Sequence, residues 1–343
     1  MAEQKSLQVA QLGAGYWGPN LIRNFYQIKA INQFFVCDLE QANLDKIKAN
    51  YPKISTTTDI DAILKNPDID AVIVAIPAFL HYEYAKRALL AGKHVFVEKP
   101  LSTTVAESQE LIDLAEKNKK VLMVGHTFLY NGAVKKIKEY IDNGELGEVY
   151  YILSQRLNLG RVRQDVNALW NLAPHDISII LYWLGEKPSN ISTKGLIFLQ
   201  KEIEDVVFVD LDFPSGRSAH IHVSWLDPSK TRKMVVVGSK KMIVYDDVSN
   251  DAKIVIYDKG IDRKNIIRNL PAIESYGHFQ LMNREGDILI PKIDFKEPLK
   301  VECQHFVDCI INQTAPLTDG RNGLDVVEVL EKAQLMLNSQ RKK

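Results

Sequence analysis

The stretch Gly13-Ala14-Gly15-Tyr16-Trp17-Gly18 follows an apolar run at residues 7–12 and precedes an amphipathic segment at residues 20–28. A strand that ends in G-x-G-x-x-G and leads into a helix is a common cradle for a dinucleotide pyrophosphate. The first glycine makes the tight turn, the second lets the backbone approach the phosphates, and the third allows close helix–strand packing. The helix N-terminus adds free N–H donors and the positive end of the helix dipole. With its flanks, the motif predicts a dinucleotide-binding turn rather than an ordinary glycine-rich turn, and it places five residues beside the cofactor: Gly13, Gly15, Tyr16, Trp17 and Gly18.

The identity of the dinucleotide is suggested by Asp38, which closes the next apolar run at residues 34–37. An acidic side chain at this position accepts hydrogen bonds from the adenosine ribose hydroxyls and repels a 2′-phosphate. We therefore expect the cofactor to be NAD and not NADP.

The composition describes a globular protein without a strong charge bias. The chain has 343 residues, which favours two domains, and 46% of them are hydrophobic, without an apolar run as long as a bilayer span. Acidic and basic residues balance at 43 each, which gives no electrostatic case for binding nucleic acid or a membrane. Residues 1–5 lead directly to the first strand, so we expect no signal peptide. The three scattered cysteines indicate neither a disulfide framework nor a zinc site, so we expect a cytoplasmic protein.

Residues 1–125 alternate short apolar strands with helical patterns. We expect strands at residues 7–12, 34–37, 71–76, 94–97 and 121–124. Helices are expected at residues 20–28, 41–50, 59–65, 81–91 and 105–118. Short apolar strands separated by helices predict a doubly wound parallel α/β sheet, a Rossmann fold.

From residue 126 to residue 343 the pattern becomes α+β. Helices are expected at residues 133–142, 174–184, 299–312 and 322–339, and the last of them could pack back on the first domain. The strands are expected at residues 148–158, 190–200, 205–213, 217–226, 233–237, 242–245 and 253–257. Successive strands linked by turns predict a large, open and mostly antiparallel sheet. Because helices commonly cover one face of such a sheet, we expect the other face to serve a homodimer or homotetramer.

Two segments lie where strands of the parallel sheet should end, the edge at which open α/β sheets bind ligands. The first is Glu98-Lys99-Pro100. Its lysine can hydrogen-bond a nicotinamide ribose and a substrate hydroxyl, although a solvated lysine before a loop would look the same. The second runs from Pro77 to His81. There the proline shapes the loop, and the histidine either packs near the nicotinamide or only begins a helix.

The segment at residues 170–176 reads Trp-Asn-Leu-Ala-Pro-His-Asp and precedes an apolar helical pattern. Pro174 suits a first helical turn, which would place His175 beside a helix N-terminus. The dipole there disfavours imidazolium, so His175 would stay neutral and able to accept a proton. A buried structural histidine fits the segment equally well.

Other polar residues of the second domain carry weaker signals. Arg156, Arg161 and Arg163 lie within eight residues, and their guanidinium groups suit an anionic sugar or nucleotide, or simply a solvated surface. His220 and His222 share one face of a strand, and without a Cys or carboxylate partner we interpret them as sheet-face residues and predict no metal site.

Taken together, these motifs resemble the Gfo/Idh/MocA oxidoreductases, the family of glucose–fructose oxidoreductase and inositol dehydrogenase. The resemblance spans nearly the whole chain, and its most specific part is the Glu-Lys-Pro segment. It rests on residues 13–20, Asp38, Pro77 with His81, residues 91–101 and residues 171–176. Within the family, residues 15–20 and 170–176 look like those of nucleotide-sugar members, such as UDP-N-acetylglucosaminuronate 3-dehydrogenases of polysaccharide biosynthesis.

The resemblance implies hydride transfer between a secondary hydroxyl of a sugar and nicotinamide. It implies His175 as general base and Lys99 as the group that orients the hydroxyl and stabilises the alkoxide. Asn171 stands where the family usually has an aspartate, so it can orient the imidazole without countering its charge. The implied cofactor contacts include Pro77, His81, Glu98 and Lys99, and the substrate contacts are Lys99, Arg156, Arg163 and His175. Two alternatives stay open: a non-catalytic NAD-binding sensor of the same fold, and a dehydratase or hydrolase that uses NAD transiently.

Overall fold

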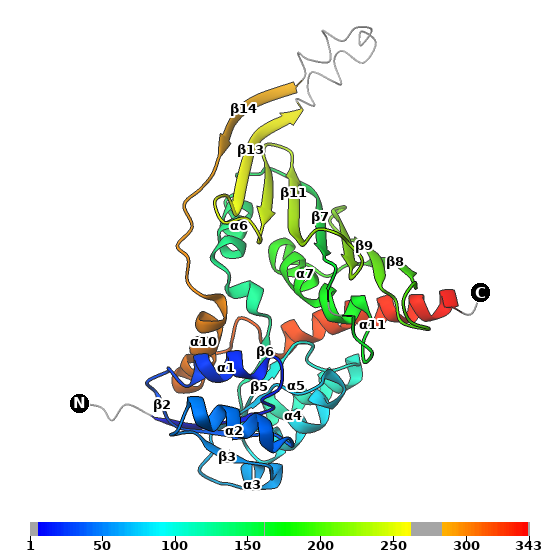
Figure 1. Ribbon diagram of the computed structural model, residues 1–343. Coiled ribbons are helices and arrows are strands. Elements are labelled where there is room, and N and C mark those ends of the chain that lie inside the picture. The colour runs from blue at the N-terminus through cyan, green and yellow to red at the C-terminus, as the bar shows by residue number, and fades with distance from the viewer. Residues whose placement is uncertain (1–5, 161, 262–282, 342–343) are drawn as a thin grey trace, which may run out of the picture. The chain divides into compact units, whose positions relative to one another are not determined.

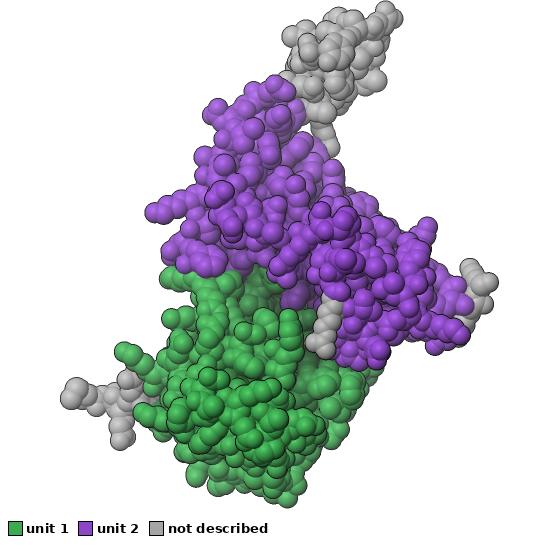
Figure 2. Space-filling model, in the orientation of Figure 1, with its two compact units in different colours: residues 1–130, 296–331 green, residues 131–295, 332–343 purple. Residues whose placement is uncertain are grey.

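The computed structural model describes residues 6–160, 162–261 and 283–341 of the chain (Figure 1). These form two compact units. The first unit contains residues 1–130 and 296–331, and the second contains residues 131–295 and 332–343, as the two colours of Figure 2 show. The chain therefore leaves the first unit five residues later than the expected boundary at residue 125, and it returns to that unit near its end.

The first unit is built on a six-stranded parallel sheet with the order β3-β2-β1-β4-β5-β6. Its strands are β1 (Leu7–Leu12), β2 (Ile31–Cys37), β3 (Ser55–Thr57), β4 (Ala71–Val74), β5 (His94–Glu98) and β6 (Leu122–Gly125). Its α-helices are α1 (Gly18–Phe25), α2 (Gln41–Asn50), α3 (Ile60–Leu64), α4 (His81–Leu90), α5 (Val105–Lys117) and α10 (Pro298–Asn312), and its short 3₁₀ turns are η1 (Ala78–Leu80) and η2 (Thr127–Tyr130). The expected doubly wound parallel sheet is confirmed, with the short edge strand β3 as an addition that its polar sequence did not indicate.

Local sequence explains where several of these helices begin. Thr104 caps α5 by accepting a hydrogen bond from the backbone N–H of Glu107 at 3.2 Å. The Glu107 carboxylate reaches back to the N–H of Thr103 at 3.2 Å. Asp59 caps α3 through the N–H of Asp61 at 2.8 Å. Such side chains satisfy backbone donors that have no partner within the helix.

An aromatic cluster packs helix α10 into the core of the first unit. The ring of Phe306 lies edge-on to Phe25 at 6.1 Å and to Phe96 at 5.7 Å between centroids. All three rings are fully buried. Edge-to-face aromatic contacts add about 0.5–1.5 kcal/mol each to the gain from burying the rings. Residues 296–331 are therefore part of the core of this unit and not an appendage.

The second unit contains an eight-stranded sheet with the order β14-β13-β12-β11-β7-β10-β9-β8. The strands are β7 (Val149–Leu157), β8 (Asn190–Leu196), β9 (Val206–Asp212), β10 (Ser218–Ser224), β11 (Thr231–Gly238), β12 (Met242–Asp246), β13 (Ile254–Ile261) and β14 (Asn283–Leu289). Among the described strands of this sheet only β7 and β10 pair in parallel, so the predicted mostly antiparallel sheet is confirmed.

Helices α6 (Gly132–Asp142) and α7 (Ala168–Leu184) belong to the second unit, and α11 (Gly320–Arg341) runs from the first unit into it. Helix α7 packs against β7, β9 and β10. Tyr151 on β7 and Phe208 on β9 remain about 40% exposed. That this sheet joins copies of the chain into an oligomer stays a prediction. Among the described residues, no helix combines the length and apolar character needed to span a membrane.

The start of α7 differs from the sequence-based expectation. The helix begins at Ala168 and is capped by Asn167, whose side-chain oxygen accepts a hydrogen bond from the N–H of Trp170 at 3.2 Å. Pro174 therefore lies inside the helix and not in its first turn. His175 sits midway along α7, so the argument that a helix N-terminus keeps it neutral was wrong, because the dipole acts mainly within a terminal turn.

A buried polar group lies at the end of β6. His126 is fully buried, and neither ring nitrogen has a hydrogen-bond partner among the described residues. Burial, aided by the positive charge of Lys99, lowers the pKa of His126 from 6.5 to about 3. The folded protein therefore keeps this imidazole neutral over a pH range in which the unfolded chain protonates it.

We predict that His126 makes the fold sensitive to mild acid. Between its unfolded pKa of 6.5 and its folded pKa of about 3, stability falls as pH falls, by about 1.4 kcal/mol per pH unit. In His126→Gln this contribution disappears, so lowering the pH from 7 to 5 should cost about 2 kcal/mol less than in wild type. Trp17 is the sole tryptophan in the sequence of the first unit. Urea unfolding of this unit can therefore be followed by tryptophan emission, excited at 295 nm, in proteins from which the other three tryptophans have been removed. Equal pH dependence in His126→Gln and in the exposed control His220→Gln would contradict the assignment.

Candidate cofactor site and catalytic residues

The glycine-rich turn between β1 and α1 is shaped by close backbone packing. Gly13 adopts a φ of +96°, a region that side chains rarely tolerate. A Cβ on Gly13 would lie 2.3 Å from the carbonyl oxygen of Ala75, and one on Gly18 would lie 2.5 Å from the carbonyl oxygen of Gly13. The first and third glycines are therefore required by the fold itself, as the motif predicts.

Gly15 differs from these two glycines because no atom lies within 4 Å of the place where its Cβ would be. Its neighbour Tyr16 is 86% exposed. Nothing in the packing of the turn excludes a side chain at Gly15, whereas a pyrophosphate that lay against this backbone would. The turn therefore fits the dinucleotide that the sequence predicts.

The buried side-chain amide of Gln11 stabilises the glycine-rich turn by hydrogen bonds to its backbone. The side-chain nitrogen of Gln11 donates to the carbonyl oxygens of Gly13 at 2.8 Å and Gly18 at 3.0 Å. Both carbonyls are thereby drawn toward the protein interior. Gln11 was not among the predicted site residues, because it lies within an apolar strand and its burial against backbone carbonyls is visible only in the structure.

Asp38 follows β2 and contacts the same turn. Its carboxylate accepts hydrogen bonds from the N–H of Ala14 at 2.6 Å, the N–H of Glu40 at 2.9 Å and the amide of Asn43 at 3.2 Å. A carboxylate has about four acceptor positions, so this one retains capacity for a ribose hydroxyl. Asp38 thus holds the turn in place, and its contact with a cofactor ribose stays a prediction.

Glu98 links the glycine-rich turn to the end of β5. Its carboxylate accepts a hydrogen bond from the indole N–H of Trp17 at 2.8 Å and another from the backbone N–H of Lys99 at 3.3 Å. A Cβ on Gly125 would lie 3.2 Å from all three carboxyl atoms, so the neighbouring strand leaves room for this group and little more. Burial raises the pKa of Glu98 to about 7, and the ammonium of Lys99 opposes that shift.

The loops after β4 and β5 are joined through His81. One ring nitrogen lies 2.6 Å from the carbonyl oxygen of Pro100, and the other lies 2.9 Å from that of Ile76. The peptide bond between Lys99 and Pro100 is cis, and the carbonyl of Pro77 accepts the N–H of Leu80 at 2.9 Å in the turn before α4. His81 is almost fully buried, and burial lowers its pKa. This ring connects two loops, and its contact with a cofactor stays a prediction.

The predicted catalytic residues of the second unit lie on α7. Asn171 and His175 are four residues apart on this helix and so share one face. The side-chain oxygen of Asn171 accepts the indole N–H of Trp225 at 3.1 Å, which fixes the amide. The backbone oxygen of His175 accepts the hydroxyl of Ser178 at 2.8 Å. Their catalytic roles stay predictions.

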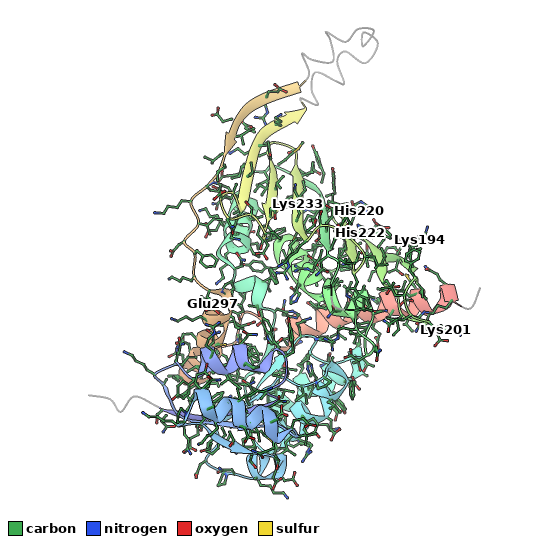
Figure 3. All side chains as sticks on the ribbon, viewed as in Figure 1. Lys194, Lys201, His220, His222, Lys233 and Glu297 are labelled. Carbon is green, nitrogen blue, oxygen red and sulfur yellow. The ribbon has the colours of Figure 1, made fainter. Side chains whose placement is uncertain are left out.

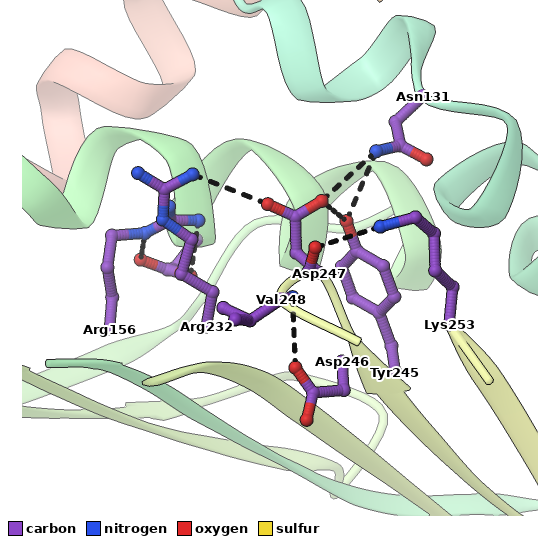
Figure 4. A network of polar contacts seen from close by, with 9 residues as sticks. Asn131, Arg156, Arg232, Tyr245, Asp246, Asp247, Val248 and Lys253 are labelled. Carbon is purple, nitrogen blue, oxygen red and sulfur yellow. Dashed lines mark hydrogen bonds and ion pairs between the residues drawn. The ribbon is translucent and has the colours of Figure 1, made fainter. Parts of the chain in front are cut away.

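The predicted anion-binding arginines already have protein partners. Arg156 is buried on β7 and donates to both oxygens of Asp176, from Nε at 2.7 Å and from Nη2 at 3.1 Å. Figure 4 shows this pair beside a second network, in which Asp247 accepts hydrogen bonds from Tyr245 at 3.0 Å and Asn131 at 3.4 Å. The guanidinium of Arg156 thus binds Asp176 on α7, and its contact with a substrate stays a prediction.

Arg163, His220 and His222 are partly exposed. Arg163 donates to Asp165 at 2.8 Å from Nε and 2.5 Å from Nη2, while Arg161 lies outside the described residues. His220 and His222, labelled in Figure 3, contact Asp210 at 2.5 Å and stack on Phe208 at 4.3 Å, respectively. Within the described part of the chain, no three His, Cys, Asp or Glu side chains are placed to hold a metal ion.

Comparisons with known proteins agree with this geometry. The profile of the "Oxidoreductase family, NAD-binding Rossmann fold" matches residues 7–126, and that of the "GFO/IDH/MocA C-terminal domain" matches residues 134–244. Together these matches cover most of the chain.

Two relatives and one solved structure illustrate the similarity. The uncharacterised oxidoreductase YrbE of Bacillus subtilis is 23% identical, with 97% of this chain and 95% of YrbE covered. The myo-inositol 2-dehydrogenase of Thermotoga maritima is 24% identical, over 75% of this chain and 80% of that protein. The structure of the UDP-N-acetylglucosamine 3-dehydrogenase GnnA from Acidithiobacillus ferrooxidans has a TM-score of 0.80 at 20% identity, over 96% and 97% of the two chains. Both domain profiles, in the expected order on the expected folds, establish that this chain belongs to the Gfo/Idh/MocA family of oxidoreductases.

Proposed function

We propose that this protein is an NAD-dependent dehydrogenase that oxidises a secondary hydroxyl of a sugar or nucleotide sugar. The observation that carries the proposal is the arrangement of the first unit. There, an open glycine-rich turn after β1, a carboxylate at the end of β2 and Lys99 at the end of β5 occupy the carboxyl ends of strands in one parallel sheet. In open α/β sheets this edge binds the dinucleotide.

The cofactor in this proposal is NAD. Asp38 places a negative charge beside the turn, which opposes a 2′-phosphate, and the matching domain profile describes an NAD-binding fold. When bound, NAD supplies the hydride acceptor, and the chain's own residues then manage the proton of the substrate hydroxyl.

Lys99 and His175 carry the acid–base chemistry in this proposal. The Lys99 ammonium orients the hydroxyl and stabilises the developing alkoxide, while the imidazole of His175 accepts the hydroxyl proton. Asn171 lacks the negative charge of an aspartate, so it orients neighbouring groups without stabilising imidazolium. Each acid–base group of this kind contributes on the order of 10²- to 10⁴-fold to the rate.

We further propose a nucleotide sugar as the substrate, with C3 of a UDP-N-acetylhexosaminuronate as the first position to test. The resemblance at residues 15–20 and 170–176 supports this choice, and so does the similarity to the structure of a UDP-N-acetylglucosamine 3-dehydrogenase. Oxidation at C3 would place the protein in polysaccharide biosynthesis.

The function is tested by incubating the protein with NAD and a panel of UDP-sugars, uronates and free polyols while NADH absorbance is followed. We expect turnover with a UDP-N-acetylhexosaminuronate. Lys99→Met and His175→Gln should each lower kcat at least 100-fold while NAD still binds. Near-normal kcat in either variant would remove that residue from the mechanism. Saturable NAD binding with no turnover on the whole panel would favour a non-catalytic sensor.

Gly15 tests the binding mode of the cofactor. Gly15→Val should leave thermal stability unchanged, because nothing lies within 4 Å of its Cβ, and should weaken NAD binding at least tenfold by blocking the backbone. Gly18→Ala is the contrasting variant, since its Cβ would clash with Gly13 and lower the Tm. Unchanged NAD affinity in Gly15→Val would place the pyrophosphate elsewhere.

Asp38 tests the choice between NAD and NADP. Asp38→Asn keeps an oxygen that can accept the Ala14 N–H and removes the negative charge. We expect the ratio of NADP to NAD affinity to rise at least tenfold, measured by titration of both cofactors. A wild-type protein that already binds NADP as tightly as NAD would refute the assignment.

A further inference from the structure

The carboxyl of Glu98 has an unusual set of neighbours within the first unit. It accepts hydrogen bonds from the Trp17 indole in the glycine-rich turn and from the N–H of Lys99. The backbone of Gly125 closes the third side, where even a methyl group would touch the carboxyl. Glu98 is therefore fixed between the turn that fits the pyrophosphate and the lysine proposed to meet the substrate.

A second carboxyl, that of Glu302 on α10, lies in the same region. It is fully buried, and one of its oxygens accepts the hydroxyl of Thr127 at 2.6 Å while the other has no partner among the described residues. Burial and the negative charge of Glu98 raise the pKa of Glu302 well above its usual value. Both effects disfavour the ionised form of Glu302, which limits the negative charge that it adds beside Glu98.

Other ionisable groups that interact with Glu98, Glu302 or their neighbours come from several elements. Lys99 on the loop after β5 favours ionisation of Glu98, and His126 after β6 is neutral above pH 3. Cys303 on α10 and Tyr130 in η2 have raised pKa values through burial and stay protonated. Arg23 on α1 and Glu297 at the start of α10 form an ion pair, so their opposite charges largely cancel. Near neutral pH, Glu98 is therefore the group in this cluster that gains or loses a proton, since burial raises its pKa to about 7.

The two redox forms of the cofactor differ in charge. The oxidised nicotinamide ring carries a positive charge and the reduced ring carries none. A nearby carboxylate attracts the oxidised ring, and the interaction is stronger in a poorly solvated site than in water. A carboxyl that is half ionised therefore gains or loses its proton according to which form is bound.

We propose that Glu98 is a proton-linked selector of cofactor redox state, which loses its proton when NAD⁺ binds and takes one up when NADH binds. The proposal rests on the proposed function, because it requires the nicotinamide to lie near Lys99. The proton comes from and returns to solvent, so no covalent step is involved. The protein then favours NAD⁺ increasingly as pH rises, in the direction that also favours oxidation of an alcohol.

The test measures Kd for NAD⁺ and NADH from pH 6 to pH 8, by titration calorimetry. In wild type, the ratio Kd(NAD⁺)/Kd(NADH) should fall by about five- to tenfold per pH unit. Calorimetry in two buffers of different ionisation enthalpy should show release of up to about half a proton per NAD⁺ bound at pH 7, because the free carboxyl is already about half ionised there. If Glu98 had only a structural role, the Kd ratio would not depend on pH and NAD⁺ binding would release no proton.

Three variants assign the effect. In Glu98→Gln, which keeps an acceptor for the Trp17 indole, the ratio should become independent of pH. Glu302→Gln removes the second carboxyl of the cluster and should retain the wild-type dependence. The control Glu116→Gln removes an exposed carboxylate of the same unit that pairs with Arg321, and should also retain it.

The outcomes separate this proposal from the proposed function. If both cofactors bind and the ratio is flat in wild type, Glu98 is not a selector, although the dehydrogenase proposal stands. A pH dependence that persists in Glu98→Gln and disappears in Glu302→Gln would also overturn the assignment. If neither cofactor binds at any pH, the cofactor proposal fails and this one fails with it.

Discussion

The first unit depends on the approach of two backbones at Gly13, where the chain turns from β1 toward α1. The α-carbon of this glycine faces the carbonyl of Ala75 so closely that a Cβ would lie 2.3 Å from the oxygen. This contact, with the amide of Gln11 beneath it, sets the direction in which α1 leaves the sheet. Trp17, just before α1, donates a hydrogen bond to Glu98. The conformation of the turn therefore helps to position Glu98, the residue that precedes Lys99.

Much of this arrangement could be predicted from sequence because its signals are local. The glycine spacing, the acidic residue after β2 and the Glu-Lys-Pro segment each lie within a few residues of the strand that positions them. The contributions of Gln11, Glu302 and Phe306 could not be predicted. Each depends on which distant backbone or side chain lies opposite, and a single sequence does not record that.

The error at α7 has a physical origin as well. Proline is common in the first turn of a helix, so Pro174 suggested a helix start there. The structure instead begins the helix at Asn167, whose cap resembles an ordinary polar loop residue in the sequence. One missing N–H at Pro174 is tolerated in a helix that packs most of its residues into the core of the second unit. Tertiary packing therefore outweighed a local propensity.

The second unit also shows how a charged residue can be part of the scaffold. Arg156 and Asp176 are both buried, and their bidentate pairing satisfies both groups at once. A buried pair contributes little net stability, but removing one partner leaves an uncompensated charge. The Arg156–Asp176 pair fixes how α7 is turned about its own axis relative to β7. Asp176 follows His175 directly, so the same pair also sets the position of His175. The predicted base is thus held in register by an arginine that looked, in sequence, like a ligand for the substrate.

The return of residues 296–331 to the first unit limits how this protein can be divided or recombined. A fragment that ends at residue 130 would expose the faces of Phe25 and Phe96 that Phe306 covers. It would also lose α10, which lies alongside α1. The first unit is consequently discontinuous in the sequence, and exchanging the second unit for another means replacing the internal residues 131–295 and the C-terminal residues 332–343 together. An exchange of the second unit therefore needs three junctions: one near residue 130, one near residue 296 and one within α11.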